Sequence, residues 1–86
     1  MLVMTEKLKW PLWWEWELVF TDYTEARMEE RRCSELDVRR MMEYASAFYR
    51  GTREGRWVIE TRSRQKPWKV IVEPDLEKKL LVVVTV

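Results

Sequence analysis

The second half of the chain holds a series of short strand-forming runs, and this feature constrains the fold most. Each run is rich in β-branched and aromatic residues. The runs predict strands at residues 47–50, 56–62, 68–73 and 80–86. Polar turns separate them and hold Gly51, Gly55, Pro67 and Pro74, residue types that favour chain reversal. Because each connection is short, the sequence predicts an antiparallel meander.

The first half predicts one more strand and two short helices. Apolar residues alternate with others over residues 12–20, which is the period of a strand. Thr21 and Asp22 both offer an N-cap for the first helix, and Asp22-x-x-Glu25 has the form of a capping box; Ser34-x-x-Asp37 is expected to cap the second helix. The first helix is expected over 23–32, and the second is expected to bury Val38, Met41, Met42 and Ala45.

These elements together predict an α+β fold. Two short helices are expected to pack on one face of a curved, mainly antiparallel sheet of four to five strands. Residues 1–86 form one domain, with a loose lead-in over 1–11. The last strand is uncharged, so it is expected to be central, beside 68–73 and the Trp-rich first strand.

Alternation along the strands divides the sheet into two faces. The face under the helices is expected to carry Trp57, Ile59, Trp68, Val70, Val72, Val82 and Val84. The opposite, half-exposed face is expected to carry Arg56, Glu60, Arg62, Lys69, Ile71 and Glu73.

The rare residue types exclude several classes of chemistry. The chain has no histidine and one cysteine, Cys33, which excludes a Ser-His-Asp triad and an ordinary zinc site. We therefore expect no metal and no cofactor. No apolar run approaches the roughly 20 residues of a membrane span. The start lacks a signal-peptide core and the cysteine is unpaired, which predicts a cytoplasmic location.

Charge is segregated although the net charge is only +1. Residues 50–69 carry seven basic and two acidic side chains, with Trp57 and Trp68 between them. Such a segment is typical of a phosphate-binding surface or of a solvated sheet face. Because one face is committed to the core, Arg56, Arg62 and Lys69 are the candidate nucleic-acid contacts.

Two further groups of side chains have both a functional and a structural interpretation. The Trp cluster could stack on bases, with Trp13 the more exposed candidate, but packing in the core is favoured. Tyr23, Arg27 and Arg31 share one helix face, which suits an anion-binding stripe. A solvated face with Glu30 pairing these arginines is favoured over that interpretation.

Several short motifs resemble a family of small, largely uncharacterised bacterial domains. The family opens with His-Ala-x-x-Arg-Met-x-x-Arg-Gly-(Ile/Val)-(Ser/Thr), and this chain has Tyr23-Thr-Glu-Ala-Arg27-Met28-Glu-Glu-Arg31-Arg32-Cys33-Ser34. Later matches are Gly55-Arg-Trp-Val58, Lys69-Val-Ile-Val-Glu73 and Val82-Val-Val-Thr-Val86. The similarity covers most of residues 16–86.

This resemblance implies the fold of RelE-like toxins and a metal-independent endoribonuclease. Arg27 and Arg31 match the family's helix arginines, and Tyr23 occupies its His position, so these three are the candidate catalytic residues. A phenol with an ordinary pKa near ~10 is a poor base at neutral pH. If the family's His is catalytic, this copy is expected to be inactive or to work differently. Arg32 stands where the family prefers Gly.

Two hypotheses for function follow. The first is a toxin-like RNA-binding domain, with or without cleavage, that pairs with an antitoxin-like protein. The alternative is a non-catalytic protein-interaction module that self-associates by adding strands along Leu80–Val86. The first requires Tyr23, Arg27, Arg31 and the cations of 56–69 to converge on one concavity.

Overall fold

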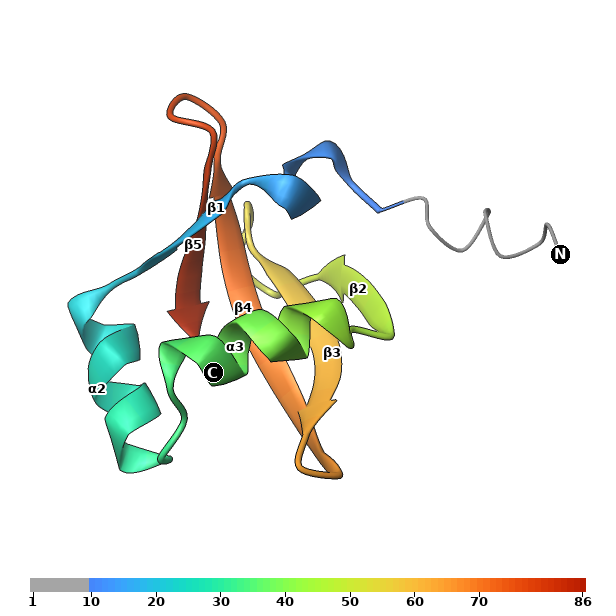
Figure 1. The fold of residues 1–86 in the computed structure, drawn as a ribbon. Helices are drawn as coiled ribbons and strands as arrows, with labels where there is room; N and C mark the ends of the chain where they lie inside the picture. The colour runs from blue at the N-terminus through green and yellow to red at the C-terminus, as the bar shows by residue number, and fades with distance from the viewer. Residues whose placement is uncertain (1–9) are drawn as a thin grey trace, which may run out of the picture.

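Residues 10–86 are the part of the chain that this computed structural model describes. They form a mixed five-stranded sheet and two helices (Figure 1). The chain runs through a 3₁₀ turn η1 (Leu12–Glu15), strand β1 (Glu17–Phe20) and helices α2 (Asp22–Glu30) and α3 (Glu35–Glu43). Four strands follow: β2 (Ala47–Arg50), β3 (Trp57–Ser63), β4 (Lys66–Asp75) and β5 (Leu80–Thr85). The predicted α+β class is confirmed. Residues 1–9 of the expected lead-in over 1–11 lie outside the described residues. Of the remaining two, Trp10 stacks on Trp14 with ring centroids 4.4 Å apart.

The strands lie in the order β1-β5-β4-β3-β2. Strands β2 to β5 pair antiparallel with their sequence neighbours, so the predicted meander is confirmed. Strand β1 pairs parallel with β5, with Glu17 opposite Leu80. The uncharged last strand is therefore internal, as expected, and the two edges are strands of four residues. Short edge strands limit pairing with other chains.

The predicted strand over 12–20 is wrong in its first half. Trp14 donates to the carbonyl of Pro11 at 3.0 Å and Trp16 to that of Trp13 at 3.1 Å, which closes a 3₁₀ turn. This turn rotates Trp13 into the core, where it is 8% exposed, and leaves Leu12 83% exposed. The interpretation of Trp13 as the exposed stacking candidate is therefore wrong, because local turn geometry overrides the alternation.

The two helix caps differ from each other in how well the sequence predicts them. Helix α3 has the expected capping box, in which Ser34 Oγ accepts from the Asp37 N–H at 3.1 Å and the Asp37 carboxylate accepts from the Ser34 N–H at 2.9 Å. Of the two expected N-caps of helix α2, Thr21 is the one used, since the Thr24 N–H donates to Thr21 Oγ1 at 3.0 Å. Asp22 is the first helical residue, so the expected Asp22–Glu25 box is wrong.

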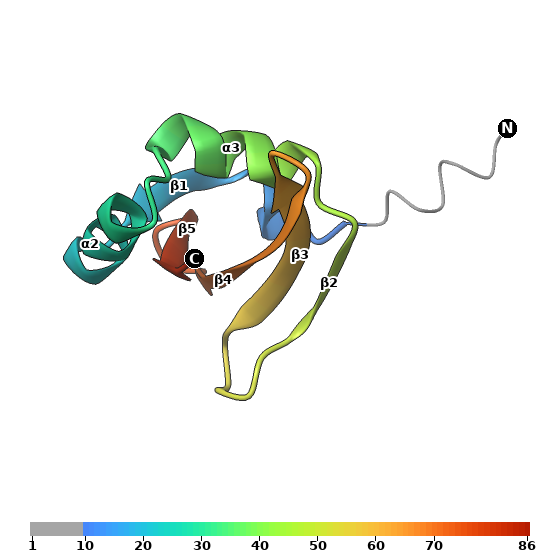
Figure 2. The ribbon, with the colours of Figure 1, turned by 90° about the horizontal axis from the view of Figure 1, so that it is seen from below.

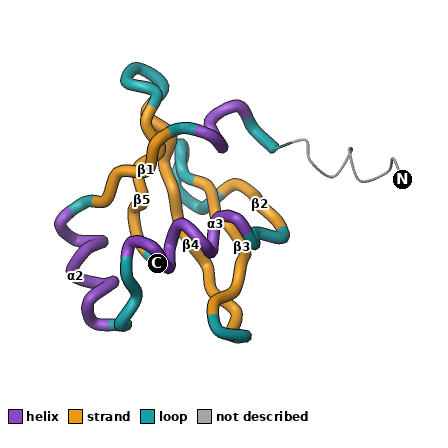
Figure 3. The backbone as a smooth tube through the Cα atoms, viewed as in Figure 1, coloured by secondary structure: helices purple, strands orange, loops and turns teal. Residues whose placement is uncertain are grey.

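The core lies between α3 and the inner side of the curved sheet, with α2 beside β5 (Figures 2 and 3). Its fully buried apolar side chains are Val38, Met41, Ile59, Val70, Val72, Leu81 and Val83. The prediction that Val82 and Val84 face the core is wrong. Val72 pairs with Val83, and the register shifts beside this pair. Because every residue from Leu80 to Val84 is apolar, alternation cannot set this register.

Helix α2 closes the outer side of β5 beyond the end of β1. The fully buried hydroxyl of Thr24 lies 2.7 Å from the Val83 carbonyl oxygen and 2.6 Å from that of Val84. Strand β5 is thus paired with β1 over Leu80–Val83, and α2 covers the carbonyls of Val83 and Val84, which leaves little open edge for self-association along Leu80–Val86. Within residues 10–86 no helix has the length and apolar character needed to cross a membrane.

Candidate nucleic-acid interface

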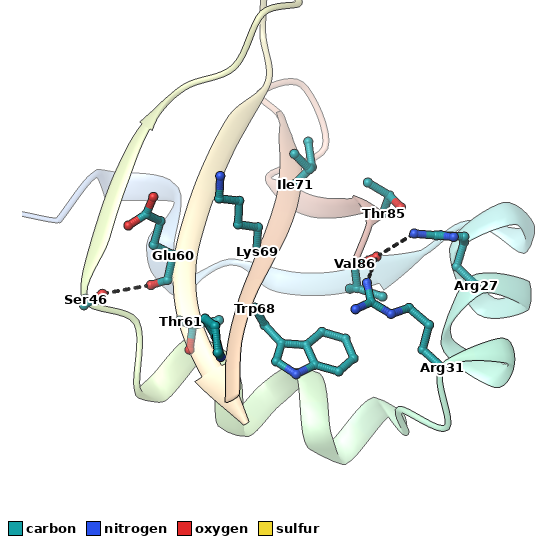
Figure 4. Close-up of a pocket in the computed structure, with 11 residues that line it drawn as sticks. Arg27, Arg31, Ser46, Glu60, Thr61, Trp68, Lys69, Ile71, Thr85 and Val86 are labelled. Atoms are coloured by element: carbon teal, nitrogen blue, oxygen red, sulfur yellow. Dashed lines mark hydrogen bonds between the residues drawn. The ribbon is translucent and has the colours of Figure 1, made fainter. Parts of the chain in front are cut away.

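An open hollow of about 680 Å³ lies on the face of the sheet away from α3 (Figure 4). Lys69 and Ile71 reach this face because they alternate along β4 with Val70 and Val72, which are buried in the core. Strands β3, β4 and β5 form its floor, and α2 forms one wall. The lining residues are Arg27, Arg31, Ser46, Glu60, Thr61, Pro67, Trp68, Lys69, Ile71, Thr85 and Val86.

The two arginines of α2 are fixed by the end of β5. Arg27 donates to the main-chain oxygen of Val86 at 3.4 Å, and Arg31 donates to the same oxygen at 3.0 Å (Figure 4). Their spacing of four residues brings both onto one side of the helix. The guanidinium carbon of Arg31 also lies 4.2 Å from the ring centroid of Trp68. These contacts hold both cations in place before any ligand arrives.

Arg27 retains unused hydrogen-bonding capacity. Its Nε is buried and has no hydrogen-bond partner among the described residues. Its nearest carboxylate is that of Glu30, at 4.0 Å, so the pair is weak. A buried N–H without an acceptor is unfavourable, and an acceptor supplied by a ligand would relieve that cost.

The structure brings together three of the six predicted site residues: Arg27, Arg31 and Lys69 line the same hollow. Tyr23 does not line it; the side chain is 63% exposed, one turn nearer the start of α2. The Arg56 Nε donates to Glu73 Oε1 at 3.1 Å, and neither residue lines the hollow. Arg62 lines a different hollow of about 730 Å³, between α3 and the β3–β4 turn.

Sequence reasoning missed Trp68 and Glu60 as lining residues. Alternation assigned Trp68 to the core, and this half-buried side chain does pack against the core while it also lines the hollow. Glu60 stands directly opposite Lys69 across the β3–β4 pair and accepts a hydrogen bond from the Tyr49 hydroxyl at 3.0 Å. The strand register pairs these opposite charges, and the sequence alone does not give that register.

The lone cysteine is not a nucleophile of this site. Burial raises the pKa of the Cys33 thiol, and the neighbouring Asp37 carboxylate raises it further. A thiol with a raised pKa stays protonated at neutral pH and reacts slowly. No cluster of three or more His, Cys, Asp or Glu that could hold a metal occurs within residues 10–86.

The arrangement can therefore bind an anion flanked by an aromatic or planar group. Arginine and lysine side chains supply the donors, and Trp68 supplies an indole face. Comparison with known proteins adds no relative: no family model, no curated protein and no solved structure matches this chain.

Proposed function

We propose that the protein is a toxin-like domain that binds single-stranded RNA in the hollow on the outer face of β3–β5. The observation that carries the proposal is the convergence of Arg27, Arg31 and Lys69 around Trp68. The resemblance to RelE-like toxin domains supports the same function, since the matched helix arginines are two of these three cations.

Each part of an RNA strand has a complementary group in the hollow. Arginine binds phosphate through paired, charge-assisted hydrogen bonds, and Lys69 adds a point charge. A base can stack on the Trp68 ring, and such stacking contributes about 1–3 kcal/mol per base. Arg31 lies over one face of that ring at 4.2 Å, so a base would stack on the part of the ring that neither Arg31 nor the core covers, next to the phosphate contact.

We further propose that the domain cleaves the bound RNA, with Glu60 as the general base in place of Tyr23. Glu60 lines the hollow, whereas Tyr23 does not. Its carboxylate would accept the proton of a ribose 2′-hydroxyl while that oxygen attacks the adjacent phosphorus. The 5′-oxygen would leave with a proton from water, giving a 2′,3′-cyclic phosphate. Arg27, Arg31 and Lys69 would stabilise the charge that develops on the phosphorus oxygens.

The binding proposal predicts that Arg31→Ala weakens RNA binding about tenfold, because one phosphate contact and the partner of Trp68 are both lost. Fluorescence anisotropy with a labelled oligouridine of about four nucleotides, near the lower end of known single-strand sites, measures this. Arg53→Ala is the matched control, since Arg53 is exposed in the β2–β3 turn. Equal affinities of the two variants, or no binding by the wild type, would contradict the proposal.

The cleavage proposal predicts RNA degradation that persists in EDTA and is lost in Glu60→Gln. Glutamine keeps the shape of the side chain and can still accept from Tyr49, but it cannot take up a proton at neutral pH. Gel analysis of a labelled transcript measures the rate, with Glu54→Gln as the control on the β2–β3 turn. Binding without cleavage by the wild type would restrict the function to RNA binding.

The geometry does not favour the alternative function of self-association through the last strand. Strand β5 is paired by β1 and β4, and α2 covers the carbonyls of Val83 and Val84. Strand addition requires unpaired backbone groups along an edge.

A further inference from the structure

We propose that the bound strand extends beyond this hollow along a basic groove, which runs around the β3–β4 turn to the flank of α3. The inference rests on the proposed function and adds the length and the path of the bound strand. It gives roles to cations that the hollow itself does not use.

The groove consists of three hollows that share walls. The first, already described, shares Arg31 and Trp68 with a second hollow of about 200 Å³. The second shares Ser63 and Arg64 with the third, of about 730 Å³. The three therefore follow one another from the outer face of the sheet, past the α2–α3 corner, to the side of α3.

Positive charge is concentrated along this path. The second hollow adds Arg32, Arg64 and Lys66, and the third adds Arg40 and Arg62. With the three cations of the first hollow, eight of the chain's 16 Lys and Arg line the groove, against two of its 15 Asp and Glu. Such an excess attracts a polyanion although the net charge of the chain is only +1.

Both acidic side chains in the groove already have partners. Glu60 accepts from Tyr49, and Asp37 accepts from the Ser34 N–H in the capping box. Asp37 also lies 3.9 Å from Arg64, an exposed and weak pair that a phosphate can replace. The two carboxylates offset only two of the eight positive charges, so the path keeps a net positive charge.

The β3–β4 turn, which carries Arg64, has a well-defined hairpin conformation. Ser63 pairs with Lys66, and the two residues between them, Arg64 and Gln65, have φ values of 54° and 68°. Two consecutive left-handed residues are typical of a type I′ turn, which matches the twist of the flanking strands. The turn thus places the backbone of Arg62 and Arg64 beside the third hollow.

The path suits a single strand and excludes a duplex. It turns from one face of the sheet to the opposite side within a domain whose radius of gyration is 13.0 Å. Duplex nucleic acid resists such bending, since the persistence length of DNA is about 150 base pairs. Aromatic rings lie along the path, with Trp68 where the first and second hollows meet and the 67%-exposed Tyr44 in the third. Both can stack on unpaired bases.

The test compares short and long single strands on the full chain. Oligouridines of about four and about twelve nucleotides fall within the range of known single-strand sites. The double variant Arg62→Ala/Arg64→Ala is expected to lose roughly tenfold in affinity for the long strand and nothing for the short one. The slope of log affinity against log salt for the long strand should fall by about 1.4, which is about 0.7 for each lost contact.

The control removes the same charge elsewhere. Arg53→Ala/Lys78→Ala alters two exposed cations in the β2–β3 and β4–β5 turns, outside all three hollows. It should leave both affinities near those of the wild type. The groove is refuted if the two double variants bind the long strand equally, or if a duplex of the same length binds as tightly as the single strand.

The outcomes separate this inference from the proposed function. If Arg31→Ala weakens binding of the short strand and Arg62→Ala/Arg64→Ala leaves the long strand unaffected, the hollow binds RNA and the groove is wrong. If the wild type binds neither strand, the proposed function is wrong and the groove with it. Both double variants change exposed side chains, so their circular dichroism spectra and melting temperatures should match the wild type.

Discussion

Arg31 shows how far a single residue could be predicted. Its place on one helix face with Arg27 follows from their spacing of four residues in the sequence. Its two decisive contacts, with the Val86 oxygen at 3.0 Å and over Trp68 at 4.2 Å, join residues far apart in the chain. Helical periodicity gives the direction of a side chain from its own helix, but it does not indicate which strand ends beside it.

The residue after Arg31 carries a backbone cost. Arg32 has φ of 54°, in the left-handed region, where the Cβ of an L-residue costs about 1–2 kcal/mol. The Cys33 N–H donates back to the Met28 carbonyl at 2.8 Å, so this conformation closes the end of α2. A glycine is preferred at such a position because it has no Cβ.

Arg32→Gly is therefore expected to stabilise the fold by about 0.5–1 kcal/mol, because relief of the left-handed strain exceeds the added entropy of the unfolded chain. Urea unfolding followed by circular dichroism measures the change. Arg40→Gly, within α3, is the control and should destabilise by about 1 kcal/mol. A loss of stability in Arg32→Gly would show that the Arg32 side chain contributes more than its backbone conformation costs.

At the level of elements, the local signals were reliable where they acted within a few residues. The Ser34–Asp37 capping box and the bounds of β2 were predicted and are confirmed. The predicted strand over 12–20 is wrong in its first half because the 3₁₀ turn η1 is compatible with the same alternation of aromatic residues and buries Trp13. Alternation shows which side chains are apolar, but it does not show the backbone conformation that buries them. A 3₁₀ turn can direct such side chains into the core as a strand can.

The capping box makes the start of α3 sensitive to acid. Hydrogen bonds from the backbone and side chain of Ser34 lower the pKa of Asp37. A carboxyl group with a lowered folded-state pKa stabilises the fold above its unfolded pKa of about 3.9, and this contribution is lost as pH falls through the folded value. Ser34→Ala should cost about 1 kcal/mol at neutral pH and less in acid.

Urea midpoints at neutral pH and below about pH 3, under the unfolded pKa of aspartate, measure this difference between Ser34→Ala and the wild type. Glu29→Gln, an exposed substitution on α2, should show no such dependence on the cap. An equal cost of Ser34→Ala at both pH values would mean that the Asp37 charge does not act through the cap.

At the level of the whole molecule, the central position of β5 organises both the fold and the candidate site. It pairs with β1 and β4, receives the Thr24 hydroxyl of α2, and ends at the Val86 oxygen that holds Arg27 and Arg31. The candidate site thus depends on how α2 docks on the sheet, and the RNA experiments above test that arrangement.

The sequence by itself determined the element types, the meander, the α+β class and the segregation of charge, because these depend on interactions between residues close together in the chain. Only the tertiary structure decided which side of β5 faces the core, that Trp13 is buried, and that Lys69 meets Arg27 and Arg31 while Tyr23, Arg56 and Arg62 lie elsewhere. These outcomes depend on strand register and helix docking, which are set by contacts between distant segments and have no signature in an apolar run such as Leu80–Val84.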